Sequence, residues 1–280
     1  MGKKNSKKII FLVLIIIVVF IFVKNLVSSY FFQKKDRINF VIYDKEPIFY
    51  SIGIKDKIHY RLKFYPDYVM VVPGGYGNYR IGALGKLINL EKNPDLFKKT
   101  FSLSTLSFTD NYFYKESQEI YYGSVNKNNF SNLLKLFTYS TNLNFFNRVY
   151  IYWQLISKKE QDYSDLELGS KKKFARLYSG YFFQKMYRDE KKNIQIIYYK
   201  NYDTANEISN IIEGNGIRVV DISENKIEKG KCRVIEESNK FSNSSKKLAE
   251  FFSCDLKKGQ TETSDIIMIL GDLEKSWEVK

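Results

Sequence analysis

The chain has 280 residues, of which 44% are hydrophobic, 16% aromatic and 27% charged, and its formal net charge is +14. This composition excludes a chain that is disordered throughout, because its apolar side chains are numerous enough to offset the entropy lost on folding. The length suits one large domain or two small ones.

The positive charge is concentrated in the first two thirds of the chain. Residues 1–37 carry 8 basic and 1 acidic side chains (+7), residues 38–192 carry 24 and 15 (+9), and residues 193–280 carry 13 and 15 (−2). A basic surface favours nucleic acid, anionic lipid or an anionic polymer as the partner, and charge alone does not choose among them.

An apolar segment, IIFLVLIIIVVFIFV, occupies residues 9–23. At about 1.5 Å per residue it covers about 22 Å of a bilayer core that is about 30 Å thick, so a spanning helix would extend beyond Val23, with Lys24 reaching the interface. A cleaved signal peptide is the alternative, but no small-x-small cleavage motif follows the segment. We therefore expect an uncleaved transmembrane anchor at residues 9–32.

The orientation of this anchor depends on the short tail that precedes it. Basic residues flank the apolar segment on both sides, so the positive-inside signal is split. A short basic tail ahead of a first apolar segment normally stays in the cytoplasm, which places residues 1–8 inside and residues 33–280 outside the cell membrane. In this single-pass arrangement no nucleic acid is expected, and anionic lipid or wall polymer becomes the natural partner.

Four segments after the anchor have the composition of short strands: residues 38–43, 47–52, 59–64 and 68–72. The segment PGGYGNYR at residues 73–80 interrupts this regularity, and helices are expected at residues 81–90 and about 94–107.

The region from Asn129 to Met186 is expected to be mainly helical. Apolar residues recur there at three- and four-residue spacings, as at Phe145, Phe146, Val149, Tyr152, Trp153 and Ile156. The polar stretch at residues 157–173 ends in Lys171, Lys172 and Lys173, and is expected to be a solvated loop. A charged segment then marks a domain boundary near residue 190.

The last ninety residues alternate between strand and helix patterns. Strands are expected at residues 194–199, 217–222, 232–237 and 265–270, with a helix at 204–213 capped by Asp203 and a second at 244–252 capped by Ser242 or Asn243. The fold class is therefore α/β (α+β), with the anchor, a mixed-sheet domain at residues 38–190 and a small βαβ-βαβ module at residues 193–280.

The two cysteines, Cys232 and Cys254, both lie in this module, and neither belongs to a CxxC motif. In an exported domain we expect them to form a disulfide, which would contribute about 3 kcal/mol by closing a loop of about twenty residues. Two separate buried thiols are the alternative. The single histidine, His59, is remote in sequence, so no metal site is expected.

Residues able to carry out catalysis are scarce. His59 alternates with apolar residues in an expected strand, which favours packing over a role as a base, and no GxSxG motif occurs. Asp67 follows Pro66 at a strand entrance, where an aspartate usually forms a turn.

The segment at residues 73–80 is the most unusual of the chain. Glycine amides can converge on an anion, an arginine can pair with it, and tyrosines can stack or donate hydrogen bonds. A tight structural turn into the following helix is the alternative reading. The candidate anion-binding residues are Gly74, Gly75, Tyr76, Gly77, Tyr79, Arg80 and Lys86.

The C-terminal module resembles the LytR C-terminal domain found in bacterial envelope proteins. The resemblance rests on IQIIYYKNYDTANEISNIIEGNGIRVVDI, SSKKLAEFFSC and SDIIMILGD, and Asn201-Tyr202 stands where many members have an Asn-Gly turn. The preceding domain is similar to a diverged LytR-CpsA-Psr domain at residues 65–74, in the helix at 83–90 and at residues 101–114.

The resemblance implies transfer of glycopolymers from a polyprenyl-pyrophosphate carrier to peptidoglycan, with arginines and aspartates that hold the pyrophosphate and a magnesium ion. This chain lacks the motif arginine, since Asp67 directly follows Pro66, and has no Arg-x-Asp pair between residues 38 and 64. Loss of bidentate arginines removes both binding and transition-state stabilisation.

We therefore expect a non-catalytic binding or scaffolding protein of the cell envelope, without a cofactor. Its expected partners are the membrane, an anionic wall polymer, peptidoglycan or other envelope proteins. The alternative is an active magnesium-dependent phosphotransferase that uses Asp67, Arg80 and Lys86.

Overall fold

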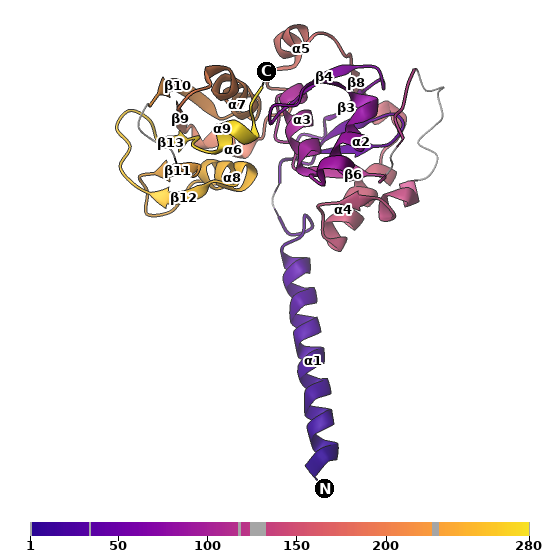
Figure 1. Cartoon of the computed structure of the whole chain (residues 1–280). Coiled ribbons are helices and arrows are strands. Elements are labelled where there is room, and N and C mark those ends of the chain that lie inside the picture. The colour runs from indigo at the N-terminus through magenta and orange to yellow at the C-terminus, as the bar shows by residue number, and fades with distance from the viewer. Residues whose placement is uncertain (1, 34, 117–118, 124–132, 226–229, 280) are drawn as a thin grey trace.

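The computed structural model describes residues 2–33, 35–116, 119–123, 133–225 and 230–279, and it describes side chains from Phe11 onward. The side chains of the expected tail at residues 1–8, and the start of the helical region expected from Asn129, lie outside the described residues. Helix α1 (Gly2–Val27) projects from a body made of two modules (Figure 1). Among helices whose side chains are described, none combines the length and the apolar character that a membrane crossing requires.

The first module is built on a six-stranded mixed sheet with the order β7-β6-β1-β2-β3-β8. The four strands expected from the sequence are confirmed: β1, β2 and β3 form an antiparallel meander, and the fourth, β4, pairs elsewhere. The strands of the six-stranded sheet are β1 (Arg37–Tyr43), β2 (Ile48–Gly53), β3 (His59–Lys63), β6 (Asn111–Tyr114), β7 (Ser140–Thr141) and β8 (Tyr163–Leu166). Strand β8 corrects the expectation of a solvated loop over residues 157–173.

Both faces of this sheet are covered, which explains why every residue of β1 is buried. Val41 and Tyr43 point to one face, while Phe40 and Ile42 point to the other, as the two-residue period of a strand requires. Helices α2 (Ile81–Glu91), α3 (Asp95–Thr105) and α5 (Lys171–Tyr178) cover the first face. Helix α4 (Phe145–Ile156) and the 3-10 helix η1 (Leu133–Phe137) cover the second.

The segment at residues 73–80, expected to be irregular, contains a strand. Strands β4 (Val69–Val72) and β5 (Gly77–Arg80) form a two-stranded antiparallel hairpin that packs on the α2 and α3 side of the module. Gly74, Gly75 and Gly77 all have positive φ angles, of 88°, 85° and 76°, so glycines supply the left-handed conformations that this turn needs.

The C-terminal module has a five-stranded sheet with the order β10-β9-β13-β11-β12. Its strands are β9 (Asn193–Tyr198), β10 (Arg218–Glu224), β11 (Arg233–Glu236), β12 (Asp255–Lys258) and β13 (Ile266–Ile269). Its helices are α6 (Lys185–Glu190), α7 (Tyr202–Gly214), α8 (Asn243–Phe252) and α9 (Leu273–Ser276). The first βαβ unit is confirmed, because β9 and β10 pair in parallel across α7.

The second βαβ unit differs from the expectation. Strand β12 is the parallel partner of β11, while β13 pairs with β11 in antiparallel fashion and with β9 in parallel. The N-cap of α7 is Asn201, whose side chain accepts from the Thr204 amide at 2.9 Å, and not Asp203. The expected Ser242 cap of α8 is confirmed.

Cys232 and Cys254 form a disulfide, as expected, with 4.7 Å between their Cα atoms. They directly precede the paired strands β11 and β12, so the bridge closes the α8 crossover at its base.

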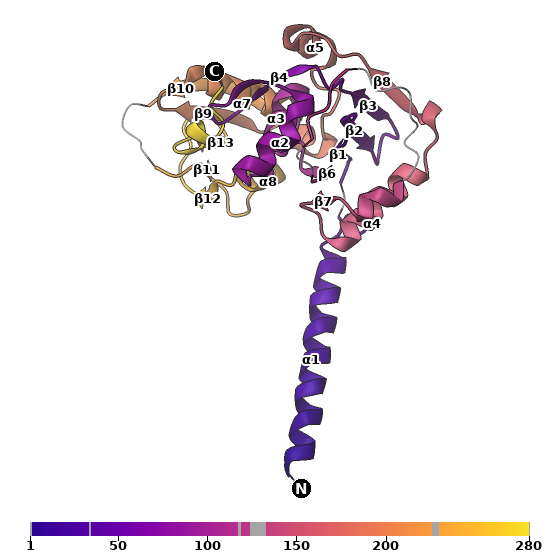
Figure 2. The same cartoon turned by 45° about the vertical axis from the view of Figure 1, so that its right-hand side comes forward.

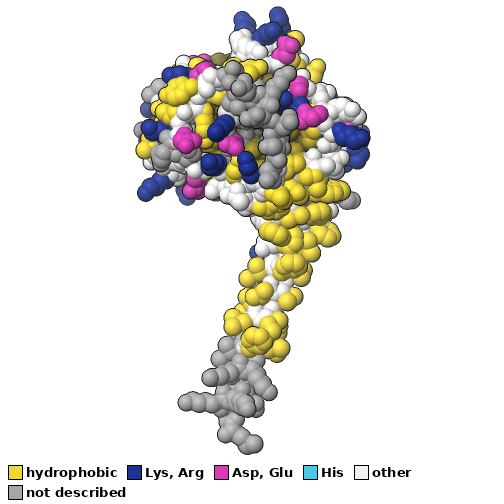
Figure 3. Space-filling model, turned by 90° about the vertical axis from the view of Figure 1, so that its right-hand side faces the viewer, with side chains coloured by type: hydrophobic (Ala, Val, Ile, Leu, Met, Phe, Trp, Pro, Cys, Tyr) yellow, Lys and Arg dark blue, Asp and Glu magenta, His cyan; other side chains and the backbone are white. Residues whose placement is uncertain are grey.

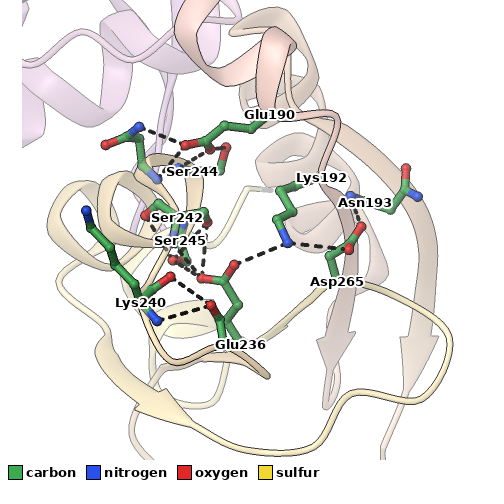
Figure 4. A network of polar contacts seen from close by, with 11 residues as sticks. Glu190, Lys192, Asn193, Glu236, Lys240, Ser242, Ser244, Ser245 and Asp265 are labelled. Atoms are coloured by element: carbon green, nitrogen blue, oxygen red, sulfur yellow. Dashed lines mark hydrogen bonds and ion pairs between the residues drawn. The ribbon is translucent and has the colours of Figure 1, made fainter.

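A network of carboxylates caps the N-terminus of α8 (Figure 4). Glu190 accepts hydrogen bonds from the backbone and side chains of both Asn243 and Ser244, and buried Glu236 accepts from the side chains of Ser242 and Ser245. Burial alone would raise the pKa of Glu190, but these hydrogen bonds outweigh it and hold that pKa below its usual range.

The two modules pack against each other beside α3. Phe108, which is fully buried, and Leu103 belong to the hydrophobic core of the C-terminal module. Asn215 Oδ1 accepts from the Phe108 amide at 3.1 Å, and the Lys99 ammonium donates to the Ser276 carbonyl at 2.8 Å.

Reduction of the disulfide is expected to lower the free energy of unfolding by about 3 kcal/mol, because the unfolded chain gains the freedom of a loop of about twenty residues. Urea titration of the wild type with and without reductant measures this. The Cys232→Ala, Cys254→Ala double variant should show no response to reductant, and a reductant effect of equal size in that variant would contradict the assignment.

Replacing Glu190 by Gln is expected to lower the free energy of unfolding by about 1 kcal/mol near neutral pH, since a charged cap of α8 is lost. A carboxylate with a lowered pKa stabilises the fold above its unfolded pKa, and that stability is lost as the pH falls through the folded value. The difference between wild type and variant should therefore shrink below about pH 4. Asp189→Asn, at an exposed position of the same helix, is the control for urea titrations across this range.

Candidate functional site

A groove of about 420 Å³ opens between the β4–β5 hairpin, α3 and the start of α5, and is called the hairpin groove below. Tyr68, Met70 and Leu103 contribute apolar surface, while Asn78 and Ser104 contribute polar groups. The remaining lining residues are Val69, Val71, Gly169, Ser170 and Lys171.

One hydrogen bond ties the segment before α5 to the residue before β4, and a second caps α5 itself. The Tyr68 hydroxyl donates to the Gly169 carbonyl at 2.8 Å, and Ser170 caps the helix by accepting from the Lys173 amide at 3.3 Å. Burial raises the pKa of Tyr68, which keeps its hydroxyl protonated as the donor. The start of α5 is therefore tied to the entrance of β4 at the groove.

Helix α5 carries a cluster of basic residues next to the groove, named the α5 cations: Lys171, Lys172, Lys173 and Arg176. Lys171 forms an ion pair with Glu207 of α7 at 2.5 Å, whereas Lys172, Lys173 and Arg176 are exposed. Lysines in the first turn of a helix face the positive end of its dipole, which costs about 0.3–1 kcal/mol each. Lys172 and Lys173 therefore do not stabilise the helix through its dipole.

The α5 cations lie far from α1. Helix α5 is at the end of the body opposite the point where α1 leaves it (Figure 1), and Lys and Arg side chains project from this end in the space-filling view (Figure 3). The groove and the cations therefore share one pole of the molecule, which we call the distal pole.

The glycine amides of the hairpin turn are already occupied. Both the Gly74 and Gly75 amides donate to the Glu278 carbonyl, at 2.9 and 3.3 Å, so they bind the C-terminal segment of this chain. The Tyr76 hydroxyl donates to Glu91 at 2.8 Å, and this bond raises the Tyr76 pKa. Tyr79 packs against the core of the first module.

Asp67 and Arg80 come together, but outside the hairpin groove. Their closest charged atoms are 3.6 Å apart, and each side chain is more than half exposed. Arg80 also lies over the ring of Tyr122 at 5.3 Å, and Asp67 accepts from the Gly123 amide at 3.0 Å. Neither is among the described residues that line the groove, and Lys86 lies farther along α2.

His59 is buried in β3, where burial lowers its pKa, and its ring lies 6.1 Å from that of Tyr163. Within the described ranges, no group of three or more His, Cys, Asp or Glu residues is placed to hold a metal ion.

Sequence reasoning missed the hairpin groove because its walls come from residues 68–78, 103–104 and 169–171. A signal for α5 was present: Ser170 is a good N-cap, and Phe174 and Tyr178 follow with helical spacing. The three lysines that suggested a solvated loop form the first turn of this helix.

Comparison with known proteins gives no family model, curated protein or solved structure that matches the chain. The similarity to LytR-CpsA-Psr proteins and the LytR C-terminal domain therefore remains a prediction from the residues quoted above.

Lys171→Ala is expected to lower the free energy of unfolding by about 0.5–1 kcal/mol, because it removes the ion pair between α5 and α7. Lys172→Ala, one residue along, should be neutral or slightly stabilising since it removes an unfavourable charge from the helix start. Thermal or urea unfolding of both variants tests this. Equal destabilisation by the two would show that the Lys171–Glu207 pair contributes nothing specific.

Proposed function

We propose that the protein is a single-pass, outward-facing cell-envelope protein that binds an anionic wall polymer at its distal pole without catalysing a reaction on it. It would be a diverged, non-catalytic relative of LytR-CpsA-Psr proteins. The observation that carries the proposal is the location of the hairpin groove and the α5 cations at the pole opposite the apolar helix α1.

Helix α1 supports membrane anchoring. Residues 11–23 are all apolar, and their side chains are 44–68% exposed on every side of the helix. A helix that is apolar all round finds a favourable environment in a bilayer rather than in water. With the short basic tail inside, the body lies outside the cytoplasm, and the Cys232–Cys254 disulfide is in keeping with an oxidising compartment.

The distal pole supports a polymer as the ligand. Three exposed cations adjoin a groove with both apolar and hydroxyl-bearing walls, which suits a chain of sugars and phosphates. Because this pole faces away from α1, lipid headgroups of the same membrane are a poor match for it.

The observation in favour of the phosphotransferase alternative is that Asp67 and Arg80 lie close together. Their exposure gives little of the desolvated, preorganised environment that stabilises a transition state. The glycine amides nearby bind Glu278 instead of an anionic substrate. We therefore favour binding without turnover.

The polymer-binding proposal predicts that full-length protein in detergent micelles co-sediments with cell-wall sacculi that retain their anionic polymer. Lys172→Gln, Lys173→Gln and Arg176→Gln together should weaken this at least about tenfold, since each cation near an anionic surface contributes about 1 kcal/mol. The effect should diminish as salt is added.

The matched control is Lys240→Gln, Lys246→Gln and Lys257→Gln, which removes three exposed charges from the C-terminal module. If the two triple variants co-sediment with sacculi to the same extent, the proposed site is refuted. It is also refuted if the wild type binds sacculi stripped of anionic polymer as well as it binds intact sacculi. Magnesium-dependent turnover of a polyprenyl-pyrophosphate glycan that Arg80→Ala abolishes would instead establish the phosphotransferase.

A further inference from the structure

Helix α4 has two apolar faces, and the core uses only one of them. Tyr150, Ile151 and Leu155 are buried against the six-stranded sheet. The residues that suggested an amphipathic helix from the sequence are largely on the other face: Phe145 is 65% exposed, and Trp153 and Ile156 are each 51% exposed. Val149 and Tyr152, which are partly exposed, fall on the same side by helical spacing.

This outer face of α4, the α4 apolar face, adjoins α1. The rings of Phe22 and Phe146 are 5.0 Å apart. The ring of Phe31, beyond the end of α1, lies 4.9 Å from that of Tyr150 on the buried side of α4. Figure 3 shows hydrophobic side chains along α1 and a larger hydrophobic patch where the body adjoins it, and Figure 2 places α4 beside the end of α1.

A hydrogen bond fixes the position of α4 relative to the anchor. The Tyr30 amide donates to Asn147 Oδ1 at 2.8 Å, and the Tyr30 ring is itself buried against the sheet. The depth of the last turns of α1 in a bilayer therefore also sets the depth of α4.

We propose that the α4 apolar face inserts into the headgroup and upper acyl region of the outer leaflet, so that α4 is a second, interfacial membrane contact. This inference rests on the proposed anchoring by α1. Trp and Tyr are the residues favoured at this depth, and an interfacial helix typically buries its apolar face about 5–10 Å into the boundary.

The charges around α4 agree with a lipid surface as the occupant. Lys135 of η1 and Lys159, just after the helix, are both exposed, so they can approach lipid phosphates, whereas the Lys158 ammonium donates to Gln154. The nearest acid after them, Glu160, pairs with Arg61 at 2.6 Å. A second protein copy has no comparable feature in its favour, because the same basic residues would face each other.

Trp153 provides a direct test, because Trp277, the other tryptophan, is only 2% exposed. The full-length protein is reconstituted into vesicles that contain phospholipid brominated either near the headgroup or near the chain ends. We expect the Trp153 emission, obtained as the difference between wild type and Trp153→Phe, to fall at least about twofold with the shallow bromines and less with the deep ones. The emission of Trp153→Phe should not change.

Flotation of the same vesicles separates the two proposals. Protein that floats while Trp153 escapes bromine quenching and is quenched by aqueous acrylamide overturns the interfacial role of α4 but leaves the anchor intact. Protein that floats with Trp153 shielded from both quenchers also overturns it, in favour of a second copy on this face. Failure to float rejects the anchor and this inference together.

Discussion

The insertion of Phe108 into the C-terminal module is the contact on which the arrangement of the other parts depends. Its ring lies 4.6 Å from that of Phe251, and its amide is bound by Asn215. The backbone segments of the two modules approach so closely here that a Cβ atom on Gly214 would lie 1.9 Å from the Leu106 carbonyl oxygen. Because Phe108 follows α3, this contact fixes one wall of the hairpin groove relative to the second module.

Charged groups join the two modules beside this contact. Asp110 pairs with Lys247 across the junction, and the Lys98 ammonium lies 4.2 Å from the ring centre of Phe251. Burial alone would raise the pKa of Asp110, but Lys247 and Lys35 outweigh it and hold that pKa low. A buried ion pair adds little net stability over apolar packing, but removal of one partner leaves a buried charge unpaired and is costly.

Elements with a clear local pattern of apolar residues could be predicted from the sequence. Elements and sites that depend on contacts between distant segments could not. Strands β1 to β4 and β9 were predictable from runs of β-branched and aromatic residues. Strand β12, with the sequence DLKK, was not, because it is an edge strand with three exposed charges. The disulfide was predicted from two cysteines outside a CxxC motif in a domain expected to be exported, and the structure forms it. The hairpin groove, made of three distant segments, had no local signature.

Helix α4 confirms the helix predicted from its apolar spacing, but that spacing leaves open which face the core covers. Most of the apolar residues whose spacing predicted this helix lie on its outer side, and the buried side is the one that carries Tyr150 and Gln154. Both faces are apolar enough to be buried, and periodicity cannot say whether protein or lipid covers each. The Phe22–Phe146 contact adds what periodicity lacks, because it joins the outer face to the apolar helix α1. Our proposals place that face in the leaflet, which would hold the α5 cations, at the opposite end of the body, at a set height above the membrane.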